Sequence, residues 1–268
     1  MCGIWAILGS SSGVIADRNA LVKNLLARGP EYMTLMDIEG TAAALGFTRL
    51  AINGLTPAGH QPFVKNGISV VCNGEIYNYK ELAERWAIDL EEGTSDCAVL
   101  PTLASRLPPS EFCRTLDGVF AFVLVDRNTN TVLVARDPYG VRPLFHATFT
   151  ATDSSFPTHM WSSELKGIPV VAGVKVEPFP PGTWARYDLT SGELLEMQKY
   201  HSVPHVKIPM FEDHRWAASD AERDVPGADG EHAPVRQQDP HCRGPGDAGR
   251  GRRAAVSGHQ PGREGAAA

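Results

Sequence analysis

The stretch that decides the fold is "GVFAFVLVDRNTNTVLVARD", residues 118–137, in which two apolar runs flank the short polar segment 127–130. Runs rich in Val and Phe on either side of a short polar turn are typical of a β-hairpin. The first run is apolar on both alternating faces, which carry Phe120, Phe122 and Leu124 on one side and Val119, Ala121, Val123 and Val125 on the other. A strand of this kind is covered on both faces. The stretch therefore predicts a strand inside a layered sandwich.

Further elements lie on both sides of this hairpin. The segment "CGIWAILG" at 2–9 predicts a buried strand, and helical candidates lie near 20–27, 80–86 and 97–105. Two strand-rich halves with a few helices predict a sandwich of α and β elements with antiparallel sheets.

Composition and charge indicate a globular protein and argue against several other classes, such as nucleic-acid-binding and membrane-spanning proteins. The 268 residues are 43% hydrophobic and 21% charged, which is ordinary for a globular protein. The net charge of −6 comes without a basic block in residues 1–200, so we expect no nucleic-acid or membrane partner. No apolar span approaches the roughly 18 residues of a membrane helix. Residues 213–268 contain no Leu, Ile, Phe or Tyr. We therefore expect one folded domain at 1–210 and disorder over 211–268.

The cysteines indicate the compartment. They stand at positions 2, 72, 97, 113 and 242, and none forms a C-x-x-C pair. An odd number without paired spacing is typical of reduced thiols rather than of a disulfide framework or a zinc site. The N-terminus lacks the positive region of a signal peptide. We expect a cytoplasmic protein without a bound metal.

The segment "VCNGEIYNYKEL" at 71–82 approaches Asn73-Gly74-Glu75 as an apolar strand and leaves it with helical spacing. Asn-Gly tolerates the positive φ angles of a tight turn, and this stretch by itself favours a turn. The alternative is an oxyanion site, because a side-chain amide and a glycine N–H at a strand end can both donate to a developing negative charge.

Cys2 is the candidate nucleophile. Removal of Met1 would leave Cys2 with a free α-amine of pKa about 8, which can take the proton of its own thiol at neutral pH. One residue would then supply both nucleophile and base. The alternative is that a cysteine at position 2 is incidental.

The order of several motifs resembles the class II glutamine amidotransferases, which are N-terminal nucleophile hydrolases whose mature chain begins Cys-Gly-Ile. The landmarks are "ARGPE" (27–31), "TRLAIN" (48–53), "HQPF" (60–63), "CNGEIYN" (72–78), "GTSDCAVL" (93–100), "LDGVFAFVLVD" (116–126), "RDPYGVRPLF" (136–145) and "SSELKG" (162–167). The form "NGEIYN" is similar to asparagine synthetases of the glutamine-hydrolysing type rather than to the phosphoribosyl or hexosamine members.

This resemblance implies an α+β fold, a four-layer αββα sandwich of antiparallel sheets. It also implies that Cys2 attacks the side-chain amide of L-glutamine and forms a γ-glutamyl thioester, releasing ammonia and then glutamate. Asn73 and Gly74 would stabilise the oxyanion, each such donor being worth about 3–4 kcal/mol.

The resemblance further implies residues that recognise the amino-acid end of glutamine. Arg49 would bind the α-carboxylate in bidentate fashion, and Asp96, assisted by Glu75, would bind the α-ammonium. Leu50, Ala51, Ile52 and Asn53 would line the wall. Taken alone, Arg49 is equally typical of a surface ion pair, and Asp96 of a helix N-cap. The motif at 136–145 is expected to be structural, with its charged side chains tying loops together.

The sequence departs from the family pattern in two places. Ala27 stands where members usually have His, which puts loop order near the site in question. The 268 residues contain no Ser-Gly-Gly-x-Asp-Ser loop of the ATP-pyrophosphatase domain that follows in a complete asparagine synthetase, and we expect the segment after Met210, by its composition, to come from a shifted reading frame. We therefore expect the glutaminase half-reaction alone, without a cofactor; ATP and Mg belong to the full-length family.

Two other interpretations stay open at this point: another class II amidotransferase, of phosphoribosyl or hexosamine type, or a catalytically idle scaffold of the same fold. The expected small-molecule partner is L-glutamine. The protein partner is left open between a second copy, giving a homodimer, and a separate synthetase domain.

Overall fold

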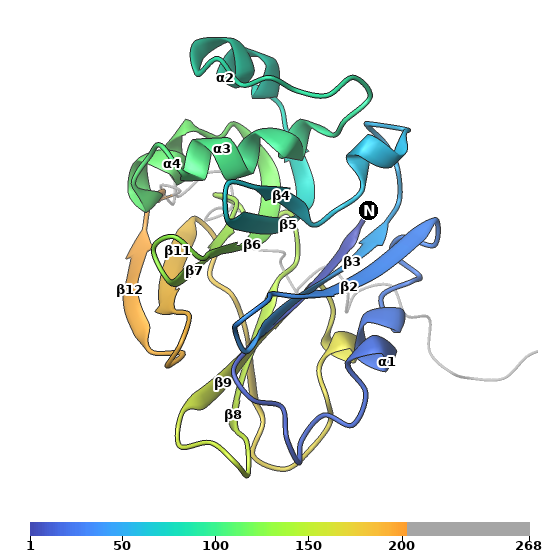
Figure 1. Ribbon diagram of the computed structural model, residues 1–268, viewed down its shortest axis with the longest axis vertical. Helices are drawn as coiled ribbons and strands as arrows, with labels where there is room; N and C mark the ends of the chain where they lie inside the picture. Colours follow the sequence, from blue (N-terminus) through green and yellow to red (C-terminus); the bar gives the residue numbers. More distant parts are fainter. Residues whose placement is uncertain (203–268) are drawn as a thin grey trace, which may run out of the picture. The chain divides into compact units, whose positions relative to one another are not determined.

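The computed structural model describes residues 1–202. The predicted disorder of 211–268 and the predicted domain boundary at 210 lie outside the described residues. Two six-stranded antiparallel sheets make up most of the described part (Figure 1). The first has the order β10-β8-β9-β1-β3-β2, and the second β12-β11-β7-β6-β5-β4.

The strand bounds follow in chain order: β1 Gly3–Leu8, β2 Tyr32–Asp37, β3 Ala43–Arg49, β4 Phe63–Lys65, β5 Ile68–Ile76, β6 Gly118–Asp126, β7 Thr131–Arg136, β8 Phe145–Thr150, β9 Pro157–Ser162, β10 Lys175–Pro178, β11 Thr183–Asp188 and β12 Leu194–Lys199. The helices are α1 Arg18–Lys23, α2 Tyr79–Arg85, α3 Leu100–Ala104 and α4 Pro109–Thr115, with 3₁₀ turns η1 Pro57–Gly59, η2 Asp96–Val99 and η3 Leu165–Gly167.

The hairpin of β6 and β7 confirms the prediction for residues 118–137. Asp126 pairs with Thr131 across the polar turn 127–130. Phe120 and Phe122 pack with residues of α3 and α4, whereas Val123, on the opposite face, packs with residues of the first sheet. Full burial of a side chain of this size contributes about 1.5–3 kcal/mol. The strand is covered on both faces because helices lie on one side and a sheet on the other.

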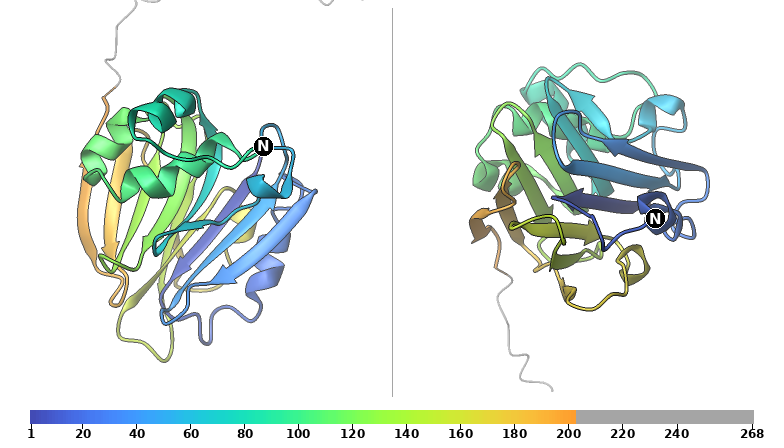
Figure 2. Two further views of the ribbon diagram at one scale, coloured as in Figure 1. Left: turned by 45° about the horizontal axis from the view of Figure 1, so that its top comes forward. Right: turned by 60° about the horizontal axis from the view of Figure 1, so that its bottom comes forward.

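Four layers result from this packing. Helices α2, α3 and α4 cover the outer face of the second sheet, and α1 lies against the outer face of the first (Figures 1 and 2). The core between the sheets contains Ile4 and Ala6 of β1 opposite Val123 of β6. Trp5 and Ile7, on the other face of β1, pack with Val22 of α1. The predicted αββα sandwich and the buried first strand are confirmed.

The helix predictions differ in accuracy. Helix α2 and the run from η2 into α3 lie where helices were predicted. The bounds predicted for the first helix, 20–27, were wrong. The side chain of Asp17 accepts hydrogen bonds from the N–H groups of Asn19 and Ala20 and so starts α1 at Arg18. After Lys23 the N–H of Leu25 bonds to the carbonyl three residues earlier, and the chain continues in turns. Helix α4 was not predicted.

Asn73-Gly74-Glu75 does not end its strand and does not form a turn. Strand β5 continues through these residues and pairs with β6 as far as Ile76 opposite Gly118. The hairpin turn lies earlier, at Asn66 and Gly67, which both have positive φ. Gly74 serves close packing, because a Cβ there would lie 2.2 Å from the carbonyl oxygen of Val119.

In residues 1–202, no helix combines the length and the apolar character that crossing a bilayer requires.

Candidate active site

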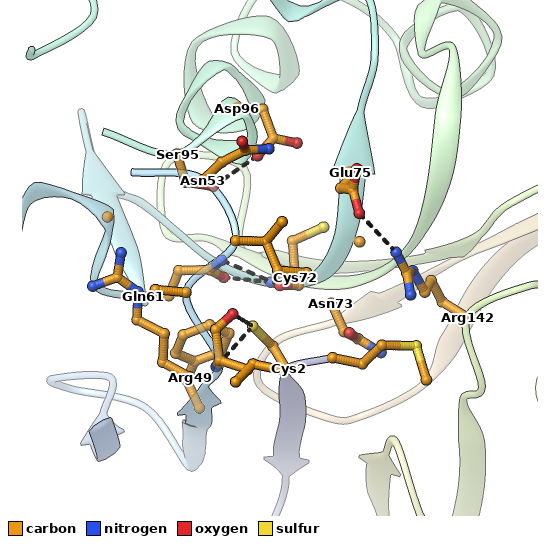
Figure 3. A pocket seen from close by; sticks show the side chains of 17 residues that line it. Cys2, Arg49, Asn53, Gln61, Cys72, Asn73, Glu75, Ser95, Asp96 and Arg142 are labelled. Carbon is orange, nitrogen blue, oxygen red and sulfur yellow. Dashed lines mark hydrogen bonds and ion pairs between the residues drawn. The ribbon is translucent and has the colours of Figure 1, made fainter. Parts of the chain in front are cut away.

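All ten residues predicted to form the site line one pocket (Figure 3). They are Cys2, Arg49, Leu50, Ala51, Ile52, Asn53, Asn73, Gly74, Glu75 and Asp96. The lining also includes residues that the sequence did not indicate: Met1, Phe47, Gly59, Gln61, Cys72, Ser95 and Arg142. The pocket draws on both sheets, because Cys2 precedes β1 of the first and Asn73 and Gly74 belong to β5 of the second. Their roles are predictions that geometry alone does not test.

The Cys2 sulfur is half-buried at this junction. Its Sγ lies 3.4 Å from both the backbone nitrogen and the backbone oxygen of Leu50. Burial raises the pKa of the Cys2 thiol, and the hydrogen bond from Leu50 only partly offsets this. The thiol is therefore mainly protonated at neutral pH and requires a base. Met1 is bonded to the nitrogen of Cys2 and also lines the pocket.

Asn73 is held beside Cys2 by Arg28. The carboxamide satisfies its neighbours when its nitrogen donates to the carbonyl oxygen of Cys2 at 3.0 Å and its oxygen accepts from Nη2 of Arg28 at 3.3 Å. Arg28 also donates from Nε to Cys2 O at 2.8 Å and pairs with Glu164 at 3.1 Å. Arg28 belongs to the motif "ARGPE", which could have signalled it. Ala27 beside it is exposed, and the Arg28 contacts are made without a His at that position.

Gly74 presents an unpaired N–H. Alternate residues of a strand point their N–H groups to the same edge. On this edge the N–H of Cys72 donates to Oε1 of Gln61, and the N–H of Ile76 donates to Oδ2 of Asp96, both at 2.6 Å. Gly74 lies between them, and its N–H has no partner among the hydrogen bonds of residues 1–202. The N–H of Gly74 is thus a backbone donor in the pocket that is free for a ligand.

Arg49 ends β3 and organises the loop that follows. Its side chain is buried, with Nη1 donating to the carbonyl of Thr56 at 3.0 Å and Nη2 to that of Gly54. A surface ion pair, the alternative for this residue, is therefore wrong. Each Nη retains a second N–H, so the predicted contact with a carboxylate stays a prediction. The loop so held carries Ile52 and Asn53, which are exposed at the pocket.

Asp96 is a buried carboxylate without a cationic partner in the described part of the chain. Its Oδ2 accepts from Ile76 N, and its Oδ1 accepts from Ser95 Oγ at 3.0 Å. The helix cap is Ser95, whose Oγ accepts from Cys97 N, so the N-cap alternative for Asp96 is wrong. A buried carboxylate is costly unless a cation or enough donors compensate it. The site is suited to an ammonium group.

Glu75 forms an ion pair with Arg142, a residue that the sequence did not place in the site. Its Oε1 lies 3.2 Å from Nη2 of Arg142. Arg142 is positioned by the loop after β7, where Asp137 accepts from the N–H groups of Tyr139, Val141 and Arg142, each at 3.0 Å. The structural role predicted for the motif at 136–145 is confirmed by these bonds. This pair leaves Oε2 of Glu75 without a partner within residues 1–202, so it is available to assist Asp96.

Among residues 1–202, no group of three or more His, Cys, Asp or Glu side chains is arranged to hold a metal ion.

Comparison with known proteins gives the family. The glutamine amidotransferase domain matches residues 1–187. Over 215 residues the chain is 36% identical to an asparagine synthetase [glutamine-hydrolyzing] of Gallus gallus, covering 75% of this chain and 37% of that protein. It is 34% identical over 226 residues to the Homo sapiens protein of the same name, covering 80% and 39%. The chain thus spans little more than a third of these relatives.

A solved structure shows the same fold. Glutamine phosphoribosylpyrophosphate amidotransferase of B. subtilis, complexed with ADP and GMP, matches with a TM-score of 0.59 at 19% identity, over 75% of this chain and 50% of that one. The chain therefore belongs to the glutamine amidotransferase domain family, as a class II member related to the asparagine synthetases.

Proposed function

We propose that this chain hydrolyses L-glutamine to L-glutamate and ammonia through a thioester on Cys2. One observation carries the proposal: a half-buried sulfur lies in the same pocket as the Asn73 carboxamide and the unpaired Gly74 N–H. Acyl transfer requires a nucleophile and oxyanion donors in one site; besides the Gly74 N–H, the Asn73 NH₂ has a second N–H in addition to the one that donates to Cys2 O.

The reaction begins with removal of Met1, which frees the α-amine of Cys2. The amine takes the thiol proton, and the thiolate attacks the side-chain carbonyl carbon of glutamine. A C–S bond forms, and the carbonyl electron pair moves to oxygen, where Asn73 Nδ2 and Gly74 N–H stabilise it. Collapse of this intermediate breaks the C–N bond, and the α-ammonium returns its proton to the leaving nitrogen, which departs as ammonia.

Water completes the cycle. It attacks the γ-glutamyl thioester, the same two donors stabilise the second oxyanion, and glutamate leaves as the thiol is restored. The substrate is held at its amino-acid end, with the ammonium at Asp96 and the carboxylate at the free N–H groups of Arg49. Leu50, Ala51, Ile52 and Asn53 form the wall beside it. These steps need no cofactor.

The use of the ammonia is a broader proposal. Because the curated relatives are asparagine synthetases, we propose that it serves asparagine formation, with ATP and Mg acting in a synthetase domain or polypeptide outside the described residues. We also propose a cytoplasmic location, since Cys2, Cys72, Cys97 and Cys113 are free thiols.

The test measures ammonia and glutamate release from L-glutamine by the full chain. We expect Cys2→Ala to abolish release. Cys113→Ala is the matched control, because that thiol is buried in the core beneath the helices and does not line the pocket, and it should retain activity. Intact mass should show the active form without Met1. Equal release by wild type and Cys2→Ala, or full activity with Met1 attached, would refute the mechanism.

A further inference from the structure

We propose that Gln61 is a positioning residue for the oxyanion site. Its side-chain carboxamide takes the place of a neighbouring strand on the free edge of β5 (Figure 3). By doing so it holds the Gly74 N–H in the pocket, where, among the described residues, this N–H is the only unpaired donor on that edge of β5. The inference rests on the proposed glutaminase function and adds a residue to it.

The register of β4 and β5 shows what Gln61 replaces. Lys65 pairs with Ile68, and Phe63 pairs with Val70, so the next position of the same kind would place residue 61 opposite Cys72. The backbone ladder ends at Phe63, however. At Cys72 the side chain of Gln61 makes the hydrogen bonds that a backbone partner would make. Its Oε1 accepts from Cys72 N at 2.6 Å, and its Nε2 donates to Cys72 O at 3.2 Å. These are the two bonds that an antiparallel strand residue exchanges with its partner.

Because a side chain replaces the strand, the pairing on this edge of β5 stops at Cys72, and Gly74 is the next residue whose N–H faces the same edge. A longer β4 would continue toward Gly74 and occupy its N–H. A single side chain satisfies Cys72 and goes no further. On the other side of Gly74, the carboxylate of Asp96 accepts from Ile76 N. Both neighbouring edge positions are therefore fixed by side chains, and the N–H between them is left for a ligand.

Fixing the neighbours matters because an oxyanion donor acts over a narrow range, about 2.7–3.1 Å from the oxygen. Active-site groups are held to within about 0.5 Å by the residues that support them. Gln61 is 5% exposed, so its carboxamide is removed from water and has Cys72 as its partner. Loss of the carboxamide would leave two buried polar groups of Cys72 unpaired and allow this part of β5 to move.

The test compares Gln61→Met, which keeps the length of the side chain and removes both hydrogen bonds, with Gln198→Met. Gln198 is exposed on β12 and does not line the pocket. We expect Gln61→Met to lower kcat by about 10- to 100-fold, less than the 10²–10³ of a donor removed outright, because Gly74 N–H is displaced rather than lost. KM should change by less than about threefold, since the proposed contacts with the amino-acid end of glutamine are made by Asp96 and Arg49 and not by Gln61. Gln198→Met should match wild type.

A γ-aldehyde analogue of glutamine gives a second measurement. Its adduct with Cys2 places an oxygen at the oxyanion position, so its affinity should weaken in proportion to kcat/KM. The affinity for glutamate, which forms no such adduct, should remain that of wild type. A merely structural role for Gln61 would weaken both ligands or neither.

A titration of active sites corrects the measured rates for any misfolded protein. Titration of Cys2 with a chloroketone analogue of glutamine counts competent sites, and rates are expressed per titrated site. Gln61→Asn keeps the carboxamide but shortens its reach by one methylene, and it should also lose kcat per titrated site. Wild-type kcat per site in both variants would overturn the inference and leave the glutaminase proposal standing. No glutamine hydrolysis by wild type would overturn the glutaminase proposal itself, and this inference with it.

Discussion

Replacement of Asp96 by Asn is the perturbation that best separates function from stability in this pocket. Asp96 is 4% exposed, and its contacts are with neutral groups: the N–H of Ile76 at 2.6 Å and the hydroxyl of Ser95 at 3.0 Å. An asparagine of the same shape keeps an oxygen for Ile76 N–H, and its NH₂ can donate to Ser95 Oγ. The substitution removes a charge and keeps the local hydrogen bonds.

The expected effect on stability is neutral or favourable. A carboxylate withdrawn from water without a cation costs several kcal/mol before its hydrogen bonds compensate it. We expect Asp96→Asn to raise the free energy of unfolding by about 1 kcal/mol. For a domain of this size that corresponds to a melting temperature about 2–4 °C higher.

The expected effect on glutamine binding is opposite and larger. Loss of one partner of a desolvated charge pair typically costs about 2–4 kcal/mol, which is about 30- to 900-fold in affinity. The loss should appear in KM, with kcat changed by less than about fivefold, because the ammonium group is remote from the bond that breaks.

The assays are thermal unfolding and steady-state ammonia release, with Asp37→Asn as the control. Asp37 has a side chain 78% exposed and pairs with Arg18 at the surface, so its loss should change stability by less than about 0.5 kcal/mol and leave KM unchanged. An unchanged KM in Asp96→Asn, or a melting temperature more than about 5 °C below wild type, would refute the view that this carboxylate is buried to receive an ammonium.

Two further predictions concern other buried polar groups. Asn73→Asp replaces the donor beside Cys2 O by a repelling oxygen. In ammonia-release assays we expect kcat to fall by about 10²–10³ or more while KM changes little. A rise in KM as large as the fall in kcat would contradict an oxyanion role. Burial, and then the neighbouring His159, lower the pKa of His146 to about 4. The unfolded chain takes up a proton near pH 6.5 and the folded chain only near pH 4, so this group's stabilisation is complete above pH 6.5 and is lost as pH falls toward 4. In urea unfolding, His146→Gln should therefore lose about 2–3 kcal/mol less stability than wild type between pH 7.5 and 4.5. An equal loss in the two proteins would contradict the prediction.

The sequence predicted the layers of the fold well, but it predicted the bounds of the first helix and of strand β5 less well. Period-two apolar patterning placed β6, β7 and the first strand correctly, because a strand apolar on both faces is stable only between two layers. The helix at 20–27 was misplaced because its start depends on a capping bond from Asp17. Asn73-Gly74 was interpreted as the end of a strand, since a local pattern cannot reveal that β6 lies close enough to require a residue without a Cβ.

Motif order predicted which residues would meet, and the family resemblance implied what they would do there. All ten predicted residues line the one pocket. The supporting residues were missed: Arg28, which contacts both Cys2 and Asn73, Gln61, which pairs with Cys72, and Arg142, which pairs with Glu75. Arg28 and Arg142 contact residues far away in the chain, and such pairs have no spacing rule in the sequence; Gln61 lies across a hairpin from Cys72, but the sequence does not show that a side chain replaces the strand there.

The sequence by itself determined the family and the sandwich and predicted the reacting groups, because patterning and short motifs are local properties of the chain. The tertiary structure alone decided that one N–H of β5 stays free while the N–H groups on either side of it are occupied. That outcome depends on where β4 stops and on side chains arriving from positions 61 and 96. Hydrogen bonds between distant segments are fixed only once the sheets have packed and excluded water from this edge.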